Sequence, residues 1–148
     1  MNEACAEFGQ PGGAYGSNYT YPTKESIDYF VNRGMNTIRF PFMWERIQPT
    51  LNGDLDSTEL QRMVNLVNYV TLSKKAVIIL DLHNYARYQN KVIGTGVPVT
   101  SLADVWGRLA QTFKGNSKVM FGLMNEPNGM STDVWIQAAN LGTADVTT

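Results

Sequence analysis

One stretch decides the fold of this chain: Val119-Met-Phe-Gly-Leu-Met-Asn-Glu-Pro127. Its nearly unbroken apolar run ends in a polar cluster, and this pattern predicts a strand buried on both faces. Pro127 cannot donate a ladder hydrogen bond, so the strand is expected to stop there. Asn125 and Glu126 are then left at the carboxyl end of a buried strand, where α/β proteins place ligands and catalytic groups. Glu126 is therefore the first candidate for a functional residue.

Similar apolar runs recur on the amino-terminal side of this stretch and alternate with helical patterns. The predicted elements are strands at 4–8, 37–42 and 76–80, helices at 24–33, 56–70, 101–113 and from Ser131 onward, and loops at 9–23 and 89–100. Strands that recur about every 40 residues, with a helix in each connection, require parallel pairing with right-handed crossovers. The sequence therefore predicts an α/β fold with a parallel sheet.

Capping residues mark where the helices begin. Thr23 and Ser101 are expected to cap two of them, and Asp56 with Glu59 forms a capping-box-like start for the third. After Leu141-Gly142 the chain turns small and polar, and the last helix is expected to fray there.

The composition is that of one globular domain, residues 1–148. The chain is 43% apolar, which suits a packed core. Its formal net charge of −1, without a basic block, argues against nucleic acid or an anionic membrane surface as the main partner. No apolar run reaches the roughly 18 residues that span a membrane. The first residues lack the basic and apolar segments of a signal peptide, so none is expected in this stretch.

Few residues are available for metal or cofactor chemistry. The single cysteine, Cys5, permits no intrachain disulfide and no cysteine-based metal site, and it is expected to be a buried small hydrophobe. The single histidine, His83, excludes a histidine-rich metal site. No Gly-x-Gly-x-x-Gly follows a strand and no phosphate loop is present. The sequence therefore predicts neither a metal nor a cofactor.

Polar residues stand at successive strand ends: Arg39 on the second strand, His83 and Asn84 after the third, and Asn125 and Glu126 after the fourth. They belong to the stretches Ala4-Cys-Ala-Glu-Phe-Gly9, Ile38-Arg-Phe-Pro-Phe-Met-Trp-Glu-Arg-Ile-Gln-Pro49, Asp81-Leu-His-Asn-Tyr-Ala-Arg-Tyr88 and Asn125-Glu-Pro127. Taken in order, this set resembles glycoside hydrolase family five, the cellulase-type (β/α)8 TIM barrels, and within it the endo-β-1,4-glucanases. The resemblance covers nearly the whole chain.

The resemblance implies a catalytic role for Glu126 and binding roles for Asn125 and Arg39. Glu126 would be the general acid/base, which protonates the leaving glycosidic oxygen and then activates water. Asn125 would hydrogen-bond the sugar 2-hydroxyl. Arg39 would contact the second carboxylate of the site and help to keep it ionised.

The resemblance also implies contacts with a β-glucan polysaccharide or oligosaccharide. His83 and Asn84 would line the site around the cleaved bond. Trp44 and Tyr85 are candidates for sugar contacts, and Glu7 would reach the site from the first strand.

Each of these residues also has a structural interpretation. Glu126 could merely cap the following helix, and His83 could be a satisfied structural histidine. Arg39 could be the partner in a buried ion pair. Trp44 could belong to the core.

The resemblance stops after four βα units, which is half of a (β/α)8 barrel. A retaining glycosidase needs two carboxyl groups about 5–5.5 Å apart, and the chain matches one of them, Glu126. Half a barrel also leaves two unpaired sheet edges. We therefore predict a homodimer in which two copies close an eight-stranded barrel by two-fold symmetry. Glu126, Glu7 or Asp81 of the partner subunit would then supply the second carboxylate.

Two functional interpretations remain open. The first is a glycoside hydrolase that cleaves β-1,4-glucan as a dimer, and the intact set of matched site residues favours it. The second is a catalytically inactive half-barrel that binds glucan or assembles with a missing half, and the unmatched nucleophile favours it. Secretion is implied by the resemblance alone, because polymeric glucan lies outside the cell.

Overall fold

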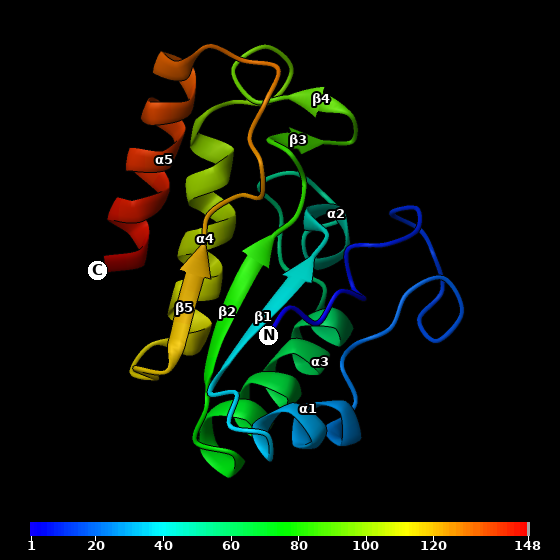
Figure 1. The fold of residues 1–148 in the computed structure, drawn as a ribbon. Coiled ribbons are helices and arrows are strands. Elements are labelled where there is room, and N and C mark those ends of the chain that lie inside the picture. Colours follow the sequence, from blue (N-terminus) through cyan, green and yellow to red (C-terminus); the bar gives the residue numbers. More distant parts are fainter. Residues whose placement is uncertain (148) are drawn as a thin grey trace.

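A parallel β-sheet forms the centre of the computed structural model, which describes residues 1–147 (Figure 1). β1 (Thr37–Phe42), β2 (Val77–Leu82) and β5 (Val119–Gly122) lie side by side in the order β1-β2-β5. Both strand pairs are parallel, so all three strands present their carboxyl ends at the same end of the sheet. This end is called the carboxyl edge. The α/β class with a parallel sheet is therefore confirmed.

Helices fill the connections between the strands, as the spacing predicted. The remaining elements are α1 (Lys24–Val31), α2 (Trp44–Ile47), α3 (Ser57–Asn68), a π-helical turn (Tyr69–Ser73), β3 (Arg87–Tyr88), β4 (Lys91–Val92), α4 (Thr100–Phe113) and α5 (Thr132–Thr147). α5 runs alongside α4 (Figure 1). Within the described part of the chain, no helix combines the length and apolar character needed to cross a bilayer.

One face of the sheet carries the core. Its strand residues are at most 2% exposed: Ile38, Phe40, Phe42, Ile78, Leu80 and Leu82. Val67 of α3 and Trp106 and Leu109 of α4 are fully buried in the same cluster. Because successive strand residues point to opposite faces, α3 and α4 cover this face of the sheet.

The opposite face is more open. Arg39, Ile79 and Met120 are register neighbours across the three strands. Met120 is 54% exposed, because no layer formed by residues 1–147 lies over it. The prediction that the strand before Glu126 is buried on both faces is therefore wrong.

Two of the predicted helix caps are confirmed. The Thr23 side chain accepts a backbone hydrogen bond of α1 at 3.1 Å. Asp56 caps α3 and accepts from the backbone of Glu59 at 2.8 Å. The Ser101 cap is wrong: α4 begins one residue earlier, its N-cap residue Val99 makes no side-chain bond, and the Ser101 side chain is buried inside the first turn.

Several predicted boundaries also need correction. Residues 4–8 form no strand and meet β1 through the single bridge Ala6–Phe42. The backbone of this segment is also bound by Arg46, which donates to the Ala6 and Phe8 carbonyls. The last helix does not fray at Gly142, because α5 continues to Thr147.

The predicted strand over 37–42 is confirmed, because β1 has these bounds. The ends of the two later strands differ from the prediction by a few residues. β2 continues past Leu80 to Leu82, so Asp81 lies in the strand and not in the following loop. β5 stops at Gly122, well before Pro127, and beyond it the Asn125 amide still donates to the Leu82 carbonyl of β2 at 2.8 Å.

The region predicted as a loop over 89–100 contains part of a β-hairpin. β3 and β4 pair antiparallel through a two-residue turn in which Gln89 and Asn90 have φ of 48° and 62°. Two consecutive positive φ values are typical of a type I′ turn. The hairpin lies beyond the carboxyl ends of the sheet strands, close to α2 (Figure 1).

Candidate active site

Arg39 joins the carboxyl ends of the strands into one network. Its Nη2 lies 2.8 Å from Asp81 Oδ2 and donates to Asn125 Oδ1 at 2.7 Å. Its Nη1 donates to Asn2 Oδ1 at 2.8 Å. Since β1 and β2 are parallel neighbours, one guanidinium reaches both β2 and the segment after β5. Two predicted site residues, Arg39 and Asn125, are thereby brought into direct contact.

His83 enters the network through Asp81. Its Nδ1 lies 2.9 Å from Asp81 Oδ2, and the Tyr85 hydroxyl lies 3.3 Å from its Nε2. The two rings meet edge to face with centroids 5.3 Å apart. A carboxylate at Nδ1 fixes the orientation of an imidazole ring. His83 and Tyr85, both predicted from the sequence, therefore lie together beside the Arg39 network.

Asp81 is the hub of this cluster, and it is only 5% exposed. Gly122 is its register neighbour on β5, and a Cβ at that position would lie 3.3 Å from Asp81 Oδ1. The bare glycine therefore leaves room for the carboxylate. Two donors, Arg39 and His83, compensate the burial of its charge. Because its side chain is buried and both oxygen-binding donors come from its own chain, Asp81 has little access to a substrate, and Glu126 and Glu7 of the partner subunit are the better sources of the second carboxylate.

Glu126 is exposed at the end of the same segment. Its backbone has a φ of 42°, in the left-handed region that non-glycine residues seldom occupy. Such conformations persist only where the surrounding structure holds them, and they cluster at active sites. Glu126 thus directly follows Asn125, whose side chain belongs to the Arg39 network, and its own side chain is exposed.

Asn84 has its amide engaged inside the protein. Oδ1 accepts from the Trp44 backbone amide at 2.7 Å, and Nδ2 donates to Glu45 Oε2 at 2.7 Å. Glu45 also accepts from the backbone of Gln89 at 2.6 Å. Asn84 therefore fastens the start of α2 and the hairpin turn at the edge of the site, a supporting role that its sequence position did not reveal.

The structure corrects the expectation for Trp44. Its ring is 0% exposed, donates from Nε1 to Gln48 at 2.9 Å, and packs edge to face on Tyr88. A ring enclosed in this way cannot stack on a sugar. The alternative interpretation, that Trp44 belongs to the core, is confirmed.

Glu7 is held by its own neighbourhood. Its Oε2 accepts from the Cys5 backbone at 2.7 Å, and within residues 1–147 no recorded hydrogen bond joins it to the Arg39 network. Cys5 is partly buried against the core, which agrees with its expected hydrophobic role. Burial, with a smaller contribution from the Glu7 charge, raises the pKa of the Cys5 thiol to about 12.

Three residues of the cluster were missed or misplaced by sequence reasoning. Asp81 was assigned to a loop, although its place after a buried run next to Arg39 in strand order was a usable signal. Asn2 lies in a segment without any strand periodicity, and nothing in the sequence marks it. Arg87 donates to the Tyr85 carbonyl and stands in the matched stretch before Tyr88, but it carries no recognisable motif of its own.

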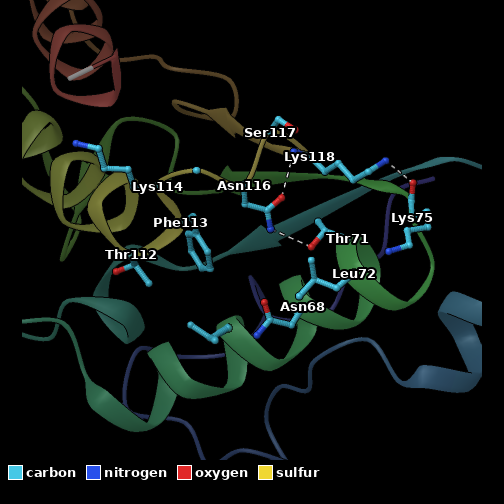
Figure 2. A pocket seen from close by; sticks show the side chains of 12 residues that line it. Asn68, Thr71, Leu72, Lys75, Thr112, Phe113, Lys114, Asn116, Ser117 and Lys118 are labelled. Carbon is cyan, nitrogen blue, oxygen red and sulfur yellow. Dashed lines mark hydrogen bonds between the residues drawn. The ribbon is translucent and has the colours of Figure 1, made fainter.

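A separate cavity of about 600 Å³ lies at the other end of the sheet (Figure 2). Its lining comes from α3, the π-helical turn, the end of α4 and the segment before β5, and it includes Lys75 and Lys118. Asn116 donates to Thr71 across it at 3.0 Å. None of the predicted site residues lines this cavity, so the candidate active site remains the cluster at the carboxyl edge.

The sequence matches the Cellulase (glycosyl hydrolase family 5) description over residues 1–147. The chain belongs to glycosyl hydrolase family 5. Among curated family members, endo-beta-1,4-glucanase B of Emericella nidulans is 34% identical, and the match covers 88% of this chain and 39% of that protein.

Solved structures of the family superpose closely on this chain. XacCel5A, solved in complex with cellopentaose, is 46% identical with a TM-score of 0.95, and the match covers 99% of this chain and 48% of that one. Pseudomonas stutzeri endoglucanase Cel5A, solved in complex with cellobiose, is 33% identical with a TM-score of 0.91, covering 99% and 45%. The chain therefore spans less than half the length of these relatives.

Proposed function

We propose that this family 5 chain carries the acid/base half of a glycoside hydrolase site that cleaves β-1,4-glucosidic bonds. The observation that carries the proposal is the placement of Glu126: exposed, in a left-handed conformation, and directly after an Asn125 side chain held by Arg39. Its substrate would be a β-glucan chain, as in the cellopentaose and cellobiose complexes of its relatives. Because such polymers lie outside the cell, we propose that the protein acts there.

In this proposal Glu126 protonates the glycosidic oxygen as the bond breaks and afterwards takes a proton from the attacking water. Asn125 supports the sugar. Its Oδ1 is held by Arg39 Nη2 at 2.7 Å, which orients the amide and turns its Nδ2 donor toward an incoming hydroxyl. The sugar 2-hydroxyl is the group whose hydrogen bond strengthens in the transition state.

A second carboxylate is still required, because a retaining site needs two such groups about 5–5.5 Å apart. We propose that a second copy supplies it when two half-barrels close into a homodimer. The open sheet face around Met120, 54% exposed on an edge strand, supports this arrangement. With Asp81 engaged by Arg39 and His83, the better sources are Glu126 or Glu7 of the partner subunit.

A second candidate function follows from the unmatched nucleophile. The chain matches one of the two carboxyl groups that a retaining site needs, Glu126, and it spans less than half of each relative. The alternative is therefore a catalytically inactive half-barrel that binds glucan or assembles with a separate second half.

Light scattering run beside a reducing-sugar assay on carboxymethyl-cellulose tests both functions on the same chromatographic peak. We expect an active dimer whose turnover is lost in Glu126→Gln and kept in the matched control Glu25→Gln, which changes an exposed residue of α1. Binding of cellopentaose without turnover would support the inactive half-barrel. An active monomer would overturn the dimer, and turnover that survives Glu126→Gln would overturn the role of Glu126.

A further inference from the structure

Arg87 connects the two segments that carry the candidate catalytic residues. Its Nη1 donates to the Tyr85 carbonyl at 2.7 Å and to Asn128 Oδ1 at 2.8 Å. Tyr85 belongs to the segment after β2 that presents His83, and Asn128 belongs to the segment after β5 that presents Glu126. One guanidinium group therefore joins the two.

Asn128 links Arg87 to Glu126 through hydrogen bonds of its side-chain amide. Its Nδ2 donates to the Glu126 carbonyl oxygen at 3.0 Å, while its Oδ1 receives Arg87. Glu126 has a φ of 42°, which needs support from outside its own backbone. The Asn128 amide, itself oriented by Arg87, gives that support directly at the residue.

Gly129 shows that the backbone is shaped to receive the guanidinium. Its φ is +80°, and a Cβ built there would lie 2.8 Å from Arg87 Nη2 and 3.5 Å from Val92 on β4. A side chain at this position would displace Arg87. The segment after β5 and the hairpin thus fit together around a single arginine.

We propose that Arg87 and Asn128 are positioning residues, which hold Glu126 where it can transfer a proton to the glycosidic oxygen. The proposal rests on the proposed function of Glu126 as general acid/base. In this proposal neither residue contacts the reacting atoms. They act by restricting the backbone on which the acid stands, and small misplacements of a catalytic group are costly to rate.

The leaving group provides a sharp test of this role. A sugar hydroxyl departs only when it is protonated, whereas dinitrophenolate departs without a proton. In Arg87→Met we expect kcat/KM for cellopentaose to fall about ten- to a hundredfold. We expect kcat/KM for dinitrophenyl β-cellobioside to change less than about threefold, because the first chemical step no longer depends on the acid.

Three further variants complete the design. Asn128→Ala should show the same pattern, and the double variant Arg87→Met/Asn128→Ala should lose little beyond either single change, because both remove one connection. Arg33→Met is the matched control. Arg33 is an exposed arginine that also donates to a backbone carbonyl, that of Tyr29, at 3.0 Å. It lies just before β1, at the amino-terminal ends of the strands, away from the candidate site. In this control kcat/KM should be unchanged for both cellopentaose and dinitrophenyl β-cellobioside.

Hydrogen exchange of the backbone amides of residue 126 and residues 128–130 tests the connection without substrate; Pro127 between them has no amide hydrogen. We expect faster exchange there in Arg87→Met than in the parent chain or in Arg33→Met. Unchanged exchange, or an equal loss on both substrates, would overturn the positioning role. A parent chain without turnover would instead overturn the proposed function, and the exchange measurement would still decide whether Arg87 holds the segment.

Discussion

Arg39 Nη2 and Asp81 Oδ2 lie 2.8 Å apart on neighbouring strands, although they are not opposite each other in register. Arg39 is aligned with Ile79, and Asp81 is aligned with Pro41. The ion pair therefore runs diagonally across the open face of the sheet. Because Asp81 Oδ2 also meets His83 Nδ1 at 2.9 Å, one buried carboxylate orients a cation from β1 and an imidazole from the segment after β2.

Loss of the Asp81 charge should destabilise the protein. In Asp81→Asn the Arg39 guanidinium keeps its place but loses its ionic partner in a largely buried setting, with Asp81 only 7% exposed at its side chain. We expect the free energy of unfolding to fall by about 2 kcal/mol. Urea titration followed by circular dichroism measures this change.

Asp54→Asn is the matched control for that measurement. Asp54 also forms an ion pair, with Arg108 at 3.0 Å, but its side chain is 100% exposed. Exposed pairs contribute little, so we expect no resolvable change in the free energy of unfolding. Equal effects of the two substitutions would contradict the view of Asp81 as a buried hub.

Alkaline pH should weaken the fold through two tyrosines bound to Glu59. Tyr19 donates to Glu59 Oε1 at 2.5 Å and Tyr21 donates to Oε2 at 3.2 Å. Burial, and then the hydrogen bond to Glu59, raises the pKa of Tyr19 to about 12. Burial, with the Glu59 charge next, raises the pKa of Tyr21 well above its ordinary value.

A tyrosine whose folded pKa lies above its unfolded value of about 10 stabilises the fold fully below pH 10, and this contribution disappears as the pH rises toward 12. We expect the free energy of unfolding, measured by urea titration, to fall steeply between about pH 10 and pH 12. Tyr19→Phe should flatten the fall, whereas Tyr29→Phe, at a residue 52% exposed, should leave it unchanged. The same steepness in Tyr19→Phe and the parent chain would rule out Tyr19 as a source.

The sequence predicted those features that depend on local pattern. Buried runs such as 76–80 and the caps at Thr23 and Asp56 are local signals, and they hold to within a residue or two. The pairing of Arg39 with Asp81 depends on strand register, which no local pattern specifies. The burial of Trp44 depends on Tyr88 in a hairpin that lacks a glycine turn signal. Arg39 and His83 were found because polar residues at successive parallel strand ends must meet at one edge.

Gly94 tests how closely the connection after β4 packs against α5. Its φ is +90°, and a Cβ there would lie 2.4 Å from Val134 Cγ1. Gly94→Ala should therefore combine backbone strain with a steric clash and lower the free energy of unfolding by about 3 kcal/mol. Gly16→Ala, at a φ of +84° with open space around it, should cost about 1 kcal/mol.

Val134→Ala in the Gly94→Ala background separates the two contributions. In the Val134→Ala background the steric clash is absent, so Gly94→Ala should cost only about as much free energy of unfolding as the backbone strain alone. Thermal unfolding of the four proteins gives the comparison. An additive loss in the double variant would contradict the predicted contact.

Met120 tests whether the open sheet face is covered in solution. It aligns with Ile79 and Arg39 on the face opposite the helices and is 54% exposed on the edge strand β5. If a second copy covers this face, Met120→Lys places a charge in the interface, and we expect the mass from light scattering to fall from dimer to monomer. Leu72→Lys is the control, because Leu72 is a similarly exposed apolar residue, 57% exposed, in the π-helical turn away from the sheet face. A dimer that withstands Met120→Lys would mean that the two copies meet elsewhere, and the proposal that two half-barrels complete one site would fail.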